Sequence, residues 1–421
     1  MEIHNPQATG TPLINGPRLS DRHREMARIG GTANGGVNRQ ALTPEDTQGR
    51  HRLLEWATAR GYTAGIDPIG NLFIRRAGTR ADLSPVMTGS HLDSQPTGGK
   101  YDGVYGVLAG LEVLETLDDH NVVTERPIEL VVWMNEEGSR FGPVTMGSAV
   151  AAGAVPLERA LAANDAKGVS VSEALARQIA ELPPMERRPL GATGHAYIEA
   201  HIEQGPVLEQ EARGIGVVSA IQGLHLYQVE VRGFEAHAGT TPSRHRKDAL
   251  VAANALIAKL RAEVADPADV LRFTVGRFEV SPGSPHIVPG KVTFSIDLRH
   301  PDPEHLLCTG DRILELCSGE IEHCMVSANV VLRSTPVQFD ARLVTAVRHA
   351  AEHRGLRYMS MVSGATHDAK YMADRTPSAM IFVPSEKGIS HNELEHTDDE
   401  DLIAGAQILC DALLAAATME L

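Results

Sequence analysis

Short apolar runs and stretches of helical periodicity alternate along the chain. Residues 86–90 and 128–134 consist mainly of apolar and small residues, which is typical of short buried strands. Between them, over 104–117, apolar residues recur at the spacing of one helical face. Strand, helix and strand in this order predict an α/β fold, in which a mixed sheet is flanked by helices.

The segment 194–203 alternates strictly between polar and apolar residues. Successive side chains of a strand point to opposite faces, so one face of this strand would be apolar. A strand whose other face is polar is expected to contribute to a specific site. That polar face would carry His195, Tyr197, Glu199, His201 and Glu203.

A second pattern interrupts the first between about residues 223 and 336. It has the order βαββαβ, which describes a compact sheet unit of its own. We therefore expect one domain made of 1–222 and 337–421, with 223–336 inserted into it and hinges at the two crossing points. The expected elements of the insertion are strand 224–231, helix 248–264, strands 270–280 and 291–299, helix 304–317 and strand 326–332.

The composition is that of an ordinary globular protein. The chain has 421 residues, of which 42% are hydrophobic and 22% charged, a size that favours two or three domains. Its 54 acidic residues outnumber its 39 basic ones, for a net charge of −15. Such a surface repels phosphate backbones, so nucleic acid is not expected as a partner.

Nothing in the sequence points to a membrane or to an oxidising compartment. No run approaches the roughly 18 uninterrupted apolar residues of a membrane span, and the first 18 residues are polar. None of the four cysteines belongs to a C-x-x-C pair, which fits reduced thiols. We therefore expect a cytoplasmic protein. The cysteines are Cys308, Cys317, Cys324 and Cys410.

Polar residues at the ends of the expected strands are candidates for metal chemistry. In open α/β sheets, ligands bind at the carboxyl edge, and His91 and Glu137 would lie there. Each residue alone is weak evidence for a metal site, because a hydrogen-bonded histidine or an acidic residue in a solvated turn gives the same sequence pattern. Five that can meet at this edge are His91, Asp102, Glu137, His201 and His391.

This donor set suits two divalent ions, with zinc expected first and manganese, cobalt or nickel as alternatives. Asp102, at a helix start, would bridge the ions. His91 and His201 would complete one shell, while Glu137 and His391 would complete the other.

Two further acids have expected roles in catalysis. Asp93 would accept the second N–H of His91 and so fix the tautomer of that ring. Glu136, next to a ligand but not needed as one, would be the general base for an attacking water. The alternative for Glu136 is a simply exposed side chain.

Several motifs in the same order resemble the hydantoinase/carbamoylase amidases. This family includes N-carbamoyl-L-amino acid hydrolases, β-ureidopropionases and allantoate amidohydrolases, and it is related to aminoacylase-type metallopeptidases. The resemblance runs from about Arg18 to the end of the chain. The motifs are Gly89–Gly103, Asn135–Gly138, His201–Pro206, Ala236–Pro242 and Gly388–Glu393.

The resemblance implies a di-metal catalytic domain and an inserted lid domain through which a homodimer forms. It also implies that His237 reaches the partner subunit's site to polarise the scissile carbonyl, that Arg299 clamps the substrate carboxylate, and that Gln204 lines the pocket. A histidine at the position of His201 resembles the carbamoylase branch, because the peptidase relatives tend to have a carboxylate there. The alternatives are a surface cation for Arg299 and a turn cap for His237.

Three positions depart from the family pattern and leave the substrate open. His286, which we expect to bind substrate, stands where Asn is frequent. His225 stands where many members have Arg, and Thr366 replaces a Gly.

These features together predict a metal-dependent amidohydrolase acting on a small ureido acid. It would cleave the ureido C–N bond of N-carbamoyl amino acids and release the amino acid, CO₂ and ammonia. The alternatives are N-carbamoyl-β-alanine or allantoate as substrate, an N-acyl amino acid deacylase or peptidase, and a catalytically dead binder of ureido acids. A binder would need the ligands but no base, so Glu136 favours an enzyme.

Overall fold

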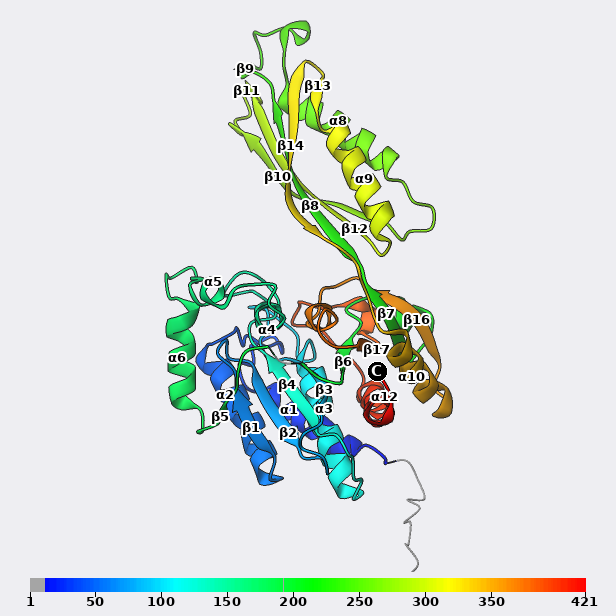
Figure 1. The fold of residues 1–421 in the computed structure, drawn as a ribbon. Helices are drawn as coiled ribbons and strands as arrows, with labels where there is room; N and C mark the ends of the chain where they lie inside the picture. The colour runs from blue at the N-terminus through cyan, green and yellow to red at the C-terminus, as the bar shows by residue number, and fades with distance from the viewer. Residues whose placement is uncertain (1–11, 192) are drawn as a thin grey trace, which may run out of the picture. The chain divides into compact units, whose positions relative to one another are not determined.

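The computed structural model describes residues 12–191 and 193–421. Contacts divide the chain into two compact units, 1–219 with 338–421 and 220–337. The sequence placed these two boundaries at 222/223 and 336/337. The α/β class, with a mixed sheet flanked by helices, is confirmed, and Figure 1 shows both units.

A mixed sheet forms the centre of the first unit. Its middle is parallel: β3 (Val86–His91) lies between β4 (Ile128–Trp133) and β6 (Ala196–Ile202), and β17 (Ser378–Val383) pairs with β6. These four strands therefore end at the same edge of the sheet. The order is β15-β7-β17-β6-β3-β4-β2-β1-β5, with β16 beside β7. The remaining strands are β1 (Thr63–Ile66), β2 (Leu72–Arg76), β5 (Glu186–Arg187), β7 (Ile215–Ile221), β15 (Val337–Gln338) and β16 (Tyr358–Ser363).

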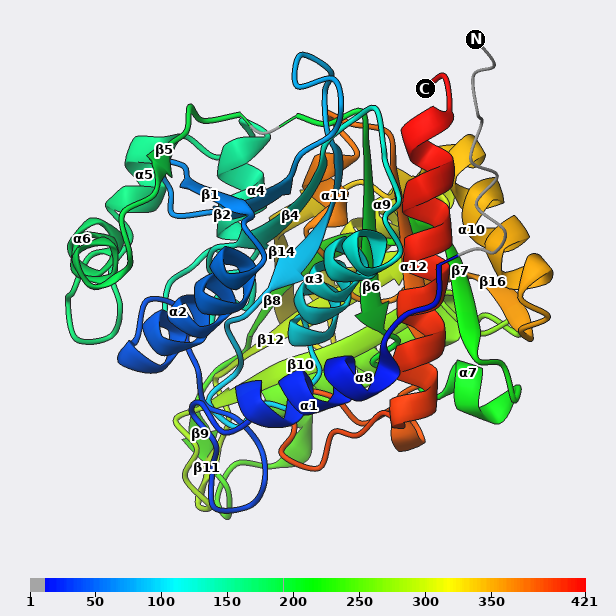
Figure 2. The same cartoon turned by 90° about the horizontal axis from the view of Figure 1, so that it is seen from below.

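Helices α3 (Val104–Asp119) and α12 (Asp399–Thr418) pack against the parallel strands and against each other, as Figure 2 shows. Helix α3 extends two residues beyond the predicted 104–117 and is buried along most of its length. The other helices of this unit are α1 (Gly16–Met26), α2 (Pro44–Ala59), α4 (Met146–Ala151), α5 (Leu157–Leu161), α6 (Val171–Glu181), α7 (Val207–Gln210), α10 (Ala341–His353) and α11 (Ala369–Met372), with a 3₁₀ turn η2 (Glu386–Gly388).

Among the described residues, α12 is the one helix long and apolar enough to cross a membrane. Over an 18-residue window of this 20-residue helix the mean hydropathy is 1.4, and 56% of that window is buried inside the protein. Leu402, Ala406 and Leu409 belong to the main hydrophobic core. A buried core helix meets the same criterion, so this property is weak evidence for a membrane span.

The second unit contains a five-stranded sheet in the order β10-β12-β8-β14-β13. Helices α8 (Ala249–Glu263) and α9 (Pro303–Leu316) lie along one face of it, as Figure 1 shows. Its long strands are those the sequence predicts, and three short strands are additional. The strands are β8 (Gly223–Arg232), β10 (Arg272–Ser281), β12 (Lys291–His300) and β14 (Cys324–Ser334), with the short β9 (Ala236–His237), β11 (Ile287–Val288) and β13 (Gly319–Ile321). A 3₁₀ turn, η1, covers Ser243–His245.

One buried histidine of the first unit lacks a hydrogen-bond partner. His23 lies on the inner face of α1, between the rings of Tyr101 and Tyr105 at centroid distances of 5.7 and 6.1 Å. Neither ring nitrogen has a partner among the described residues. Burial lowers the pKa of His23 to about 4, because a charged imidazole would lose its hydration without compensation.

We therefore expect His23 to make the protein acid-sensitive. Its pKa is lower in the folded state than in the unfolded chain, so unfolding takes up a proton and stability falls as the pH drops through 6.5 towards 4. The loss should reach about 3 kcal/mol at pH 4. Urea unfolding across this pH range should show that the free energy of unfolding of His23→Phe depends less steeply on pH than that of the wild type, by about one proton. Replacing His353, exposed on α10, by Gln should leave the slope unchanged. An unchanged slope in His23→Phe would contradict the assignment.

Candidate metal centre

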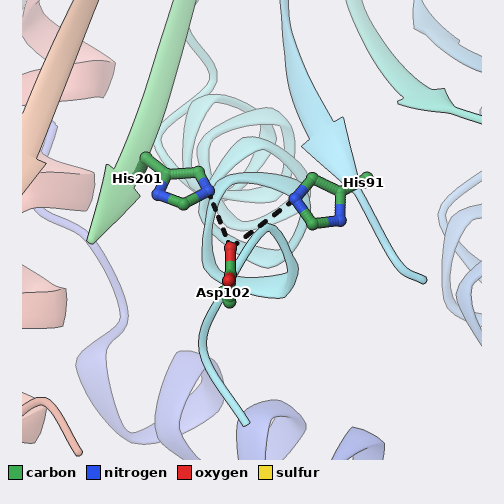
Figure 3. Close-up of side chains that lie close together, drawn as sticks. All are labelled: His91, Asp102 and His201. Carbon is green, nitrogen blue, oxygen red and sulfur yellow. Dashed lines mark ion pairs between the residues drawn. The ribbon is translucent and has the colours of Figure 1, made fainter. Parts of the chain in front are cut away.

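Two histidines on neighbouring parallel strands converge on one carboxylate. His91 ends β3, His201 lies near the end of β6, and Asp102 stands in the loop before α3. Both Nε2 atoms face Asp102 Oδ1, His201 at 3.2 Å and His91 at 3.7 Å, as Figure 3 shows. All three side chains are buried. The arrangement is what the sequence predicts for the first ion.

The other nitrogen of each ring is held by the backbone. His91 Nδ1 lies 2.9 Å from the carbonyl oxygen of Asp93, and His201 Nδ1 lies 2.8 Å from that of Ile202. A carbonyl only accepts hydrogen bonds, so both Nδ1 atoms carry a proton. In the neutral rings, the Nε2 lone pairs therefore face a carboxylate oxygen, and His201 Nε2 also accepts the Gly103 N–H at 3.2 Å. A cation would fit among the three groups.

A second group shares Asp102. Its other oxygen, Oδ2, lies 3.2 Å from His391 Nε2, which in turn lies 3.4 Å from Glu137 Oε2. Gln95 donates a hydrogen bond of 2.7 Å to Glu137 Oε2. Within each group, the potential ligand atoms lie within 4.8 Å of one another. Because each group uses a different oxygen of Asp102, the donor set fits two ions bridged by one carboxylate.

Gly103 makes the close approach to His91 possible. Its φ of +68° lies in the left-handed region, and a Cβ at this position would overlap the imidazole of His91. The turn can therefore bring Asp102 under the ring only with a glycine after it.

The role of Asp93 differs from the sequence prediction. Its carboxylate is 3.7 Å from His91 Nδ1, and its backbone carbonyl accepts the hydrogen bond of the imidazole N–H instead. The carboxylate accepts the backbone N–H groups of Glu136 at 3.2 Å and Glu137 at 3.1 Å. The carbonyl oxygen can accept this hydrogen bond because the main chain passes close to the ring immediately after β3. Asp93 thus holds the loop that carries Glu136 and Glu137.

Glu136 lies beside the first group, with Oε2 3.5 Å from His91 Nε2. Burial, helped by the nearby carboxylates of Asp368 and Glu137, raises its pKa well above the usual value. The side chain is largely buried, so the interpretation as an exposed residue is wrong.

The titratable groups of the centre shift one another's pKa values. Burial alone would raise the pKa of Asp102, but hydrogen bonds with His201 and His391 outweigh it and lower that pKa well below the usual value. The same bonds raise the pKa of His391 to about 9, and that of His201 to about 9 against the effect of its burial. Burial raises the pKa of Glu137 to about 8. Buried histidines and carboxylates that depend on shared protons are a donor set that fits metal ions.

Gln204 contacts the second group directly. Its Nε2 donates to Asp102 Oδ2 at 2.9 Å and to Ser390 Oγ at 3.1 Å. The backbone of Gln204 has a positive φ of 58°, which turns the chain immediately after β6.

The other expected substrate-binding residues belong to the second unit. His237 and His286 are exposed and adjoin each other, because β9 pairs with β11 and the Ala238 N–H donates to the His286 carbonyl. His237 Nδ1 accepts the N–H groups of Gly239 at 3.0 Å and Thr240 at 3.2 Å, as a turn cap. The proton of a neutral His237 is therefore on Nε2, which makes that atom a hydrogen-bond donor.

Arg299 is not an isolated surface cation. Its Nε and Nη2 bind the two carboxylate oxygens of Asp297 at 2.9 and 3.1 Å, two residues earlier on β12. His225, one of the departures from the family pattern, is buried in the second unit and pairs with the Tyr227 hydroxyl at 2.9 Å. Thr366 lies in the loop between β16 and α11.

Three buried residues near the centre were not predicted as site residues. Glu199, on the expected polar face of β6, accepts bonds from Ser90, Tyr197 and the Ala369 N–H. His367 packs its ring on that of His201 at 4.4 Å. The alternation of polar and apolar residues predicts that Glu199 lies on the polar face of its strand, but no local pattern predicts the contacts of His367.

The third is Glu395, which bonds to the loops of two ligands and is treated below. In the sequence, only its position four residues after His391 indicates that Glu395 lies near the site.

Residues 87–415 match the family described as Peptidase family M20/M25/M40. An N-carbamoyl-L-amino-acid amidohydrolase of Rhizobium meliloti is 42% identical over 409 residues, which cover 96% of this chain and 97% of that protein. An allantoate amidohydrolase of Bacillus subtilis is 34% identical over 397 residues, covering 94% and 96%. The crystal structure of a hydantoinase/carbamoylase family amidase from Burkholderia multivorans superposes with a TM-score of 0.91 at 43% identity, covering 98% of this chain and 100% of that one.

Gly103→Ala should reduce metal binding as well as stability. The new Cβ displaces His91, and disturbing the support of a ligand typically costs 10- to 100-fold in affinity. Gly61→Ala is the matched control, because Gly61 has a similar φ of +78° but open space around its Cβ position. Both variants should lose about 1 kcal/mol to backbone strain, and only Gly103→Ala should lose metal affinity in calorimetric titration. Equal metal affinities in the two variants would contradict this role of Gly103.

Proposed function

Because the chain belongs to the peptidase family M20/M25/M40, we propose that it is a metal-dependent amidohydrolase that cleaves the ureido C–N bond of N-carbamoyl amino acids. Its amidohydrolase relatives and its family place it among hydrolases of amide C–N bonds. The observation that carries the proposal is the carboxylate of Asp102 shared by two ligand groups, with Glu136 beside them. The products are the amino acid, CO₂ and ammonia.

The proposed cofactors are two divalent ions, with Zn²⁺ first and Mn²⁺, Co²⁺ or Ni²⁺ as alternatives. His91, Asp102 and His201 would hold one ion, and Asp102, Glu137 and His391 the other. When bound, the ions supply Lewis acidity to the ureido carbonyl and to the attacking water.

Glu136 is the proposed general base. It accepts a proton from the water that attacks the ureido carbonyl, and it returns the proton to the nitrogen of the breaking C–N bond. Its neighbour Asp93 holds the backbone N–H groups of residues 136 and 137, so the base and a ligand move together. This support keeps the base at a fixed position during both proton transfers.

His237 is the proposed donor to the carbonyl oxygen, where negative charge develops. Its Nδ1 already accepts two backbone N–H groups, which leaves the proton on Nε2 for that purpose. Arg299 is the proposed partner of the substrate carboxylate, oriented by its two bonds to Asp297. Gln204 and His286 are proposed as further substrate-binding residues.

N-carbamoyl-α-amino acids are the first choice of substrate, supported by the 42% identity to the Rhizobium meliloti protein. Allantoate is the second candidate, supported by the 34% identity to the Bacillus subtilis protein. N-carbamoyl-β-alanine differs from the first by a methylene group, a difference worth only about 1–3 kcal/mol in a pocket.

We propose a cytoplasmic location as well. The four cysteines form no disulfide in the structure, and three of them are buried. Reduced thiols are the rule in that compartment.

A substrate panel tests the proposed reaction. Metal-free protein loaded with Zn²⁺, Mn²⁺ or Co²⁺ should release ammonia from N-carbamoyl-α-amino acids faster than from N-carbamoyl-β-alanine, allantoate or N-acetyl amino acids. Chelation should abolish the release. Glu136→Gln should bind both ions but lose roughly 10² to 10⁴ in rate, the usual contribution of a general base. Preference for acetyl substrates would indicate a deacylase, and full activity without metal would refute the mechanism.

The homodimer is also a proposal. The second unit exposes apolar side chains along β10 and β14, and exposed apolar strands of this kind are typical of interfaces. His237 and Arg299 would then serve the metals of the partner subunit. The exposed residues are Phe278, Met325, Val330, Val331 and Leu332.

Mixed dimers test this arrangement. Glu136→Gln and Arg299→Ala homodimers should both be nearly inactive. In a purified heterodimer of the two variants, one site carries both defects and the other carries neither, so about half of the wild-type rate should return by symmetry. If each site used residues of a single chain, both sites would carry one defect and no activity would return. Two different tags select the heterodimer, and size-exclusion chromatography verifies its mass.

A further inference from the structure

A buried carboxylate connects two loops of the metal centre. Glu395 lies four residues after His391, in the segment between β17 and α12, and it is 1% exposed. It belongs to neither ligand group. Burial of a carboxylate is costly unless hydrogen bonds replace its hydration, so its position calls for a reason.

Three hydrogen bonds provide that compensation. Glu395 Oε1 accepts the backbone N–H groups of Tyr101 at 2.9 Å and Asp102 at 3.1 Å. Glu395 Oε2 accepts the hydroxyl of Ser390 at 2.9 Å. One carboxylate thus fastens the backbone of the bridging ligand to the residue next to His391.

The loop opposite is shaped to receive this side chain. A Cβ at Gly99 would overlap the carboxylate of Glu395, so a glycine is required where the chain passes it. The turn from Gly99 to Asp102 thus wraps around Glu395.

The two ligand groups differ in their need for such a connection. His91 and His201 lie on paired strands of the central sheet, which fix them. His391 stands in a loop, its backbone has a φ of +52°, and its side chain is 51% exposed. Asp102 and Glu137 also come from loops. The second group therefore has no regular element of its own to hold it together.

We propose that Glu395 is a positioning residue that sets the distance between Asp102 and His391, and thereby the affinity of the second ion. This inference rests on the proposed two-ion function. Loss of the carboxylate frees the His391 loop from the Asp102 backbone, so the second group opens. The strand-borne pair, His91 and His201, keeps its own support, so the first ion is affected less.

Metal titration of the metal-free protein tests the inference without substrate. Co²⁺ binding is followed by visible absorption and by calorimetry, which resolve two binding steps and the coordination spectrum of each. Glu395→Ala should weaken the second step by about 10- to 100-fold, the usual effect of losing a residue that supports a ligand. The first step should change much less, and circular dichroism should show the wild-type fold.

Two further variants separate positioning from a merely structural role. Glu395→Gln keeps an oxygen for both backbone N–H groups and an amide that can donate to Ser390, so it should restore most of the second-step affinity and the Co²⁺ spectrum. Glu395→Asp is one methylene shorter and should fall in between; it carries the test if the alanine variant fails to fold.

Glu393→Ala is the matched control on the same loop. Glu393 binds Thr32 Oγ1 at 2.5 Å and Asn34 Nδ2 at 2.8 Å, and therefore fastens the loop to the N-terminal segment rather than to Asp102. It should leave both steps unchanged.

Each remaining outcome decides a specific point. Two wild-type steps with unchanged second-step affinity in folded Glu395→Ala or Glu395→Asp would overturn the inference alone. An equal loss in Glu393→Ala would also overturn it, because any anchor of the loop would then suffice. A single step in the wild-type protein would overturn the two-ion function and the inference with it.

Discussion

The metal centre depends on one carboxylate that faces two ways. Asp102 presents Oδ1 to His91 and His201 and Oδ2 to His391. Removing the side chain would take a ligand from both groups at once. The surroundings are arranged for its position: Gly103 gives it access to the His91 ring, and Glu395 holds its backbone. Burying several carboxylates together is costly unless positive charge compensates them. Metal ions or bound protons can provide that charge.

Backbone groups, more than side chains, orient the ligands. Carbonyl oxygens hold the Nδ1 atoms of His91 and His201, and the N–H groups of residues 136 and 137 attach to Asp93. Because these main-chain groups follow directly on strands that fix them, they would lose little conformational freedom when metal binds. The same principle applies to His237, whose tautomer is set by two N–H groups of its own turn.

Sequence patterns predicted the elements and the convergence of the ligands, because strand ends of a parallel sheet meet at one edge whatever their distance along the chain. They failed where contacts depend on exact backbone direction. A His-x-Asp spacing fits both a side-chain and a main-chain acceptor, and the structure uses the main chain of Asp93. Likewise, the bond between Glu395 and Tyr101 spans 294 residues, and no local pattern signals it. Arg299 and Asp297 lie two residues apart on one strand, so they share a face and can pair.

The order of the ligands along the chain has a consequence for biosynthesis. Four of them lie before the second unit, and His391 follows it. Domains generally fold as units, and the first unit contains residues from both sides of the second. Strand β17, which pairs with β6, and His391 both follow the second unit along the chain, so the central sheet and the second group are completed only after that unit has been made. A chain truncated before His391 would lack one member of the second group.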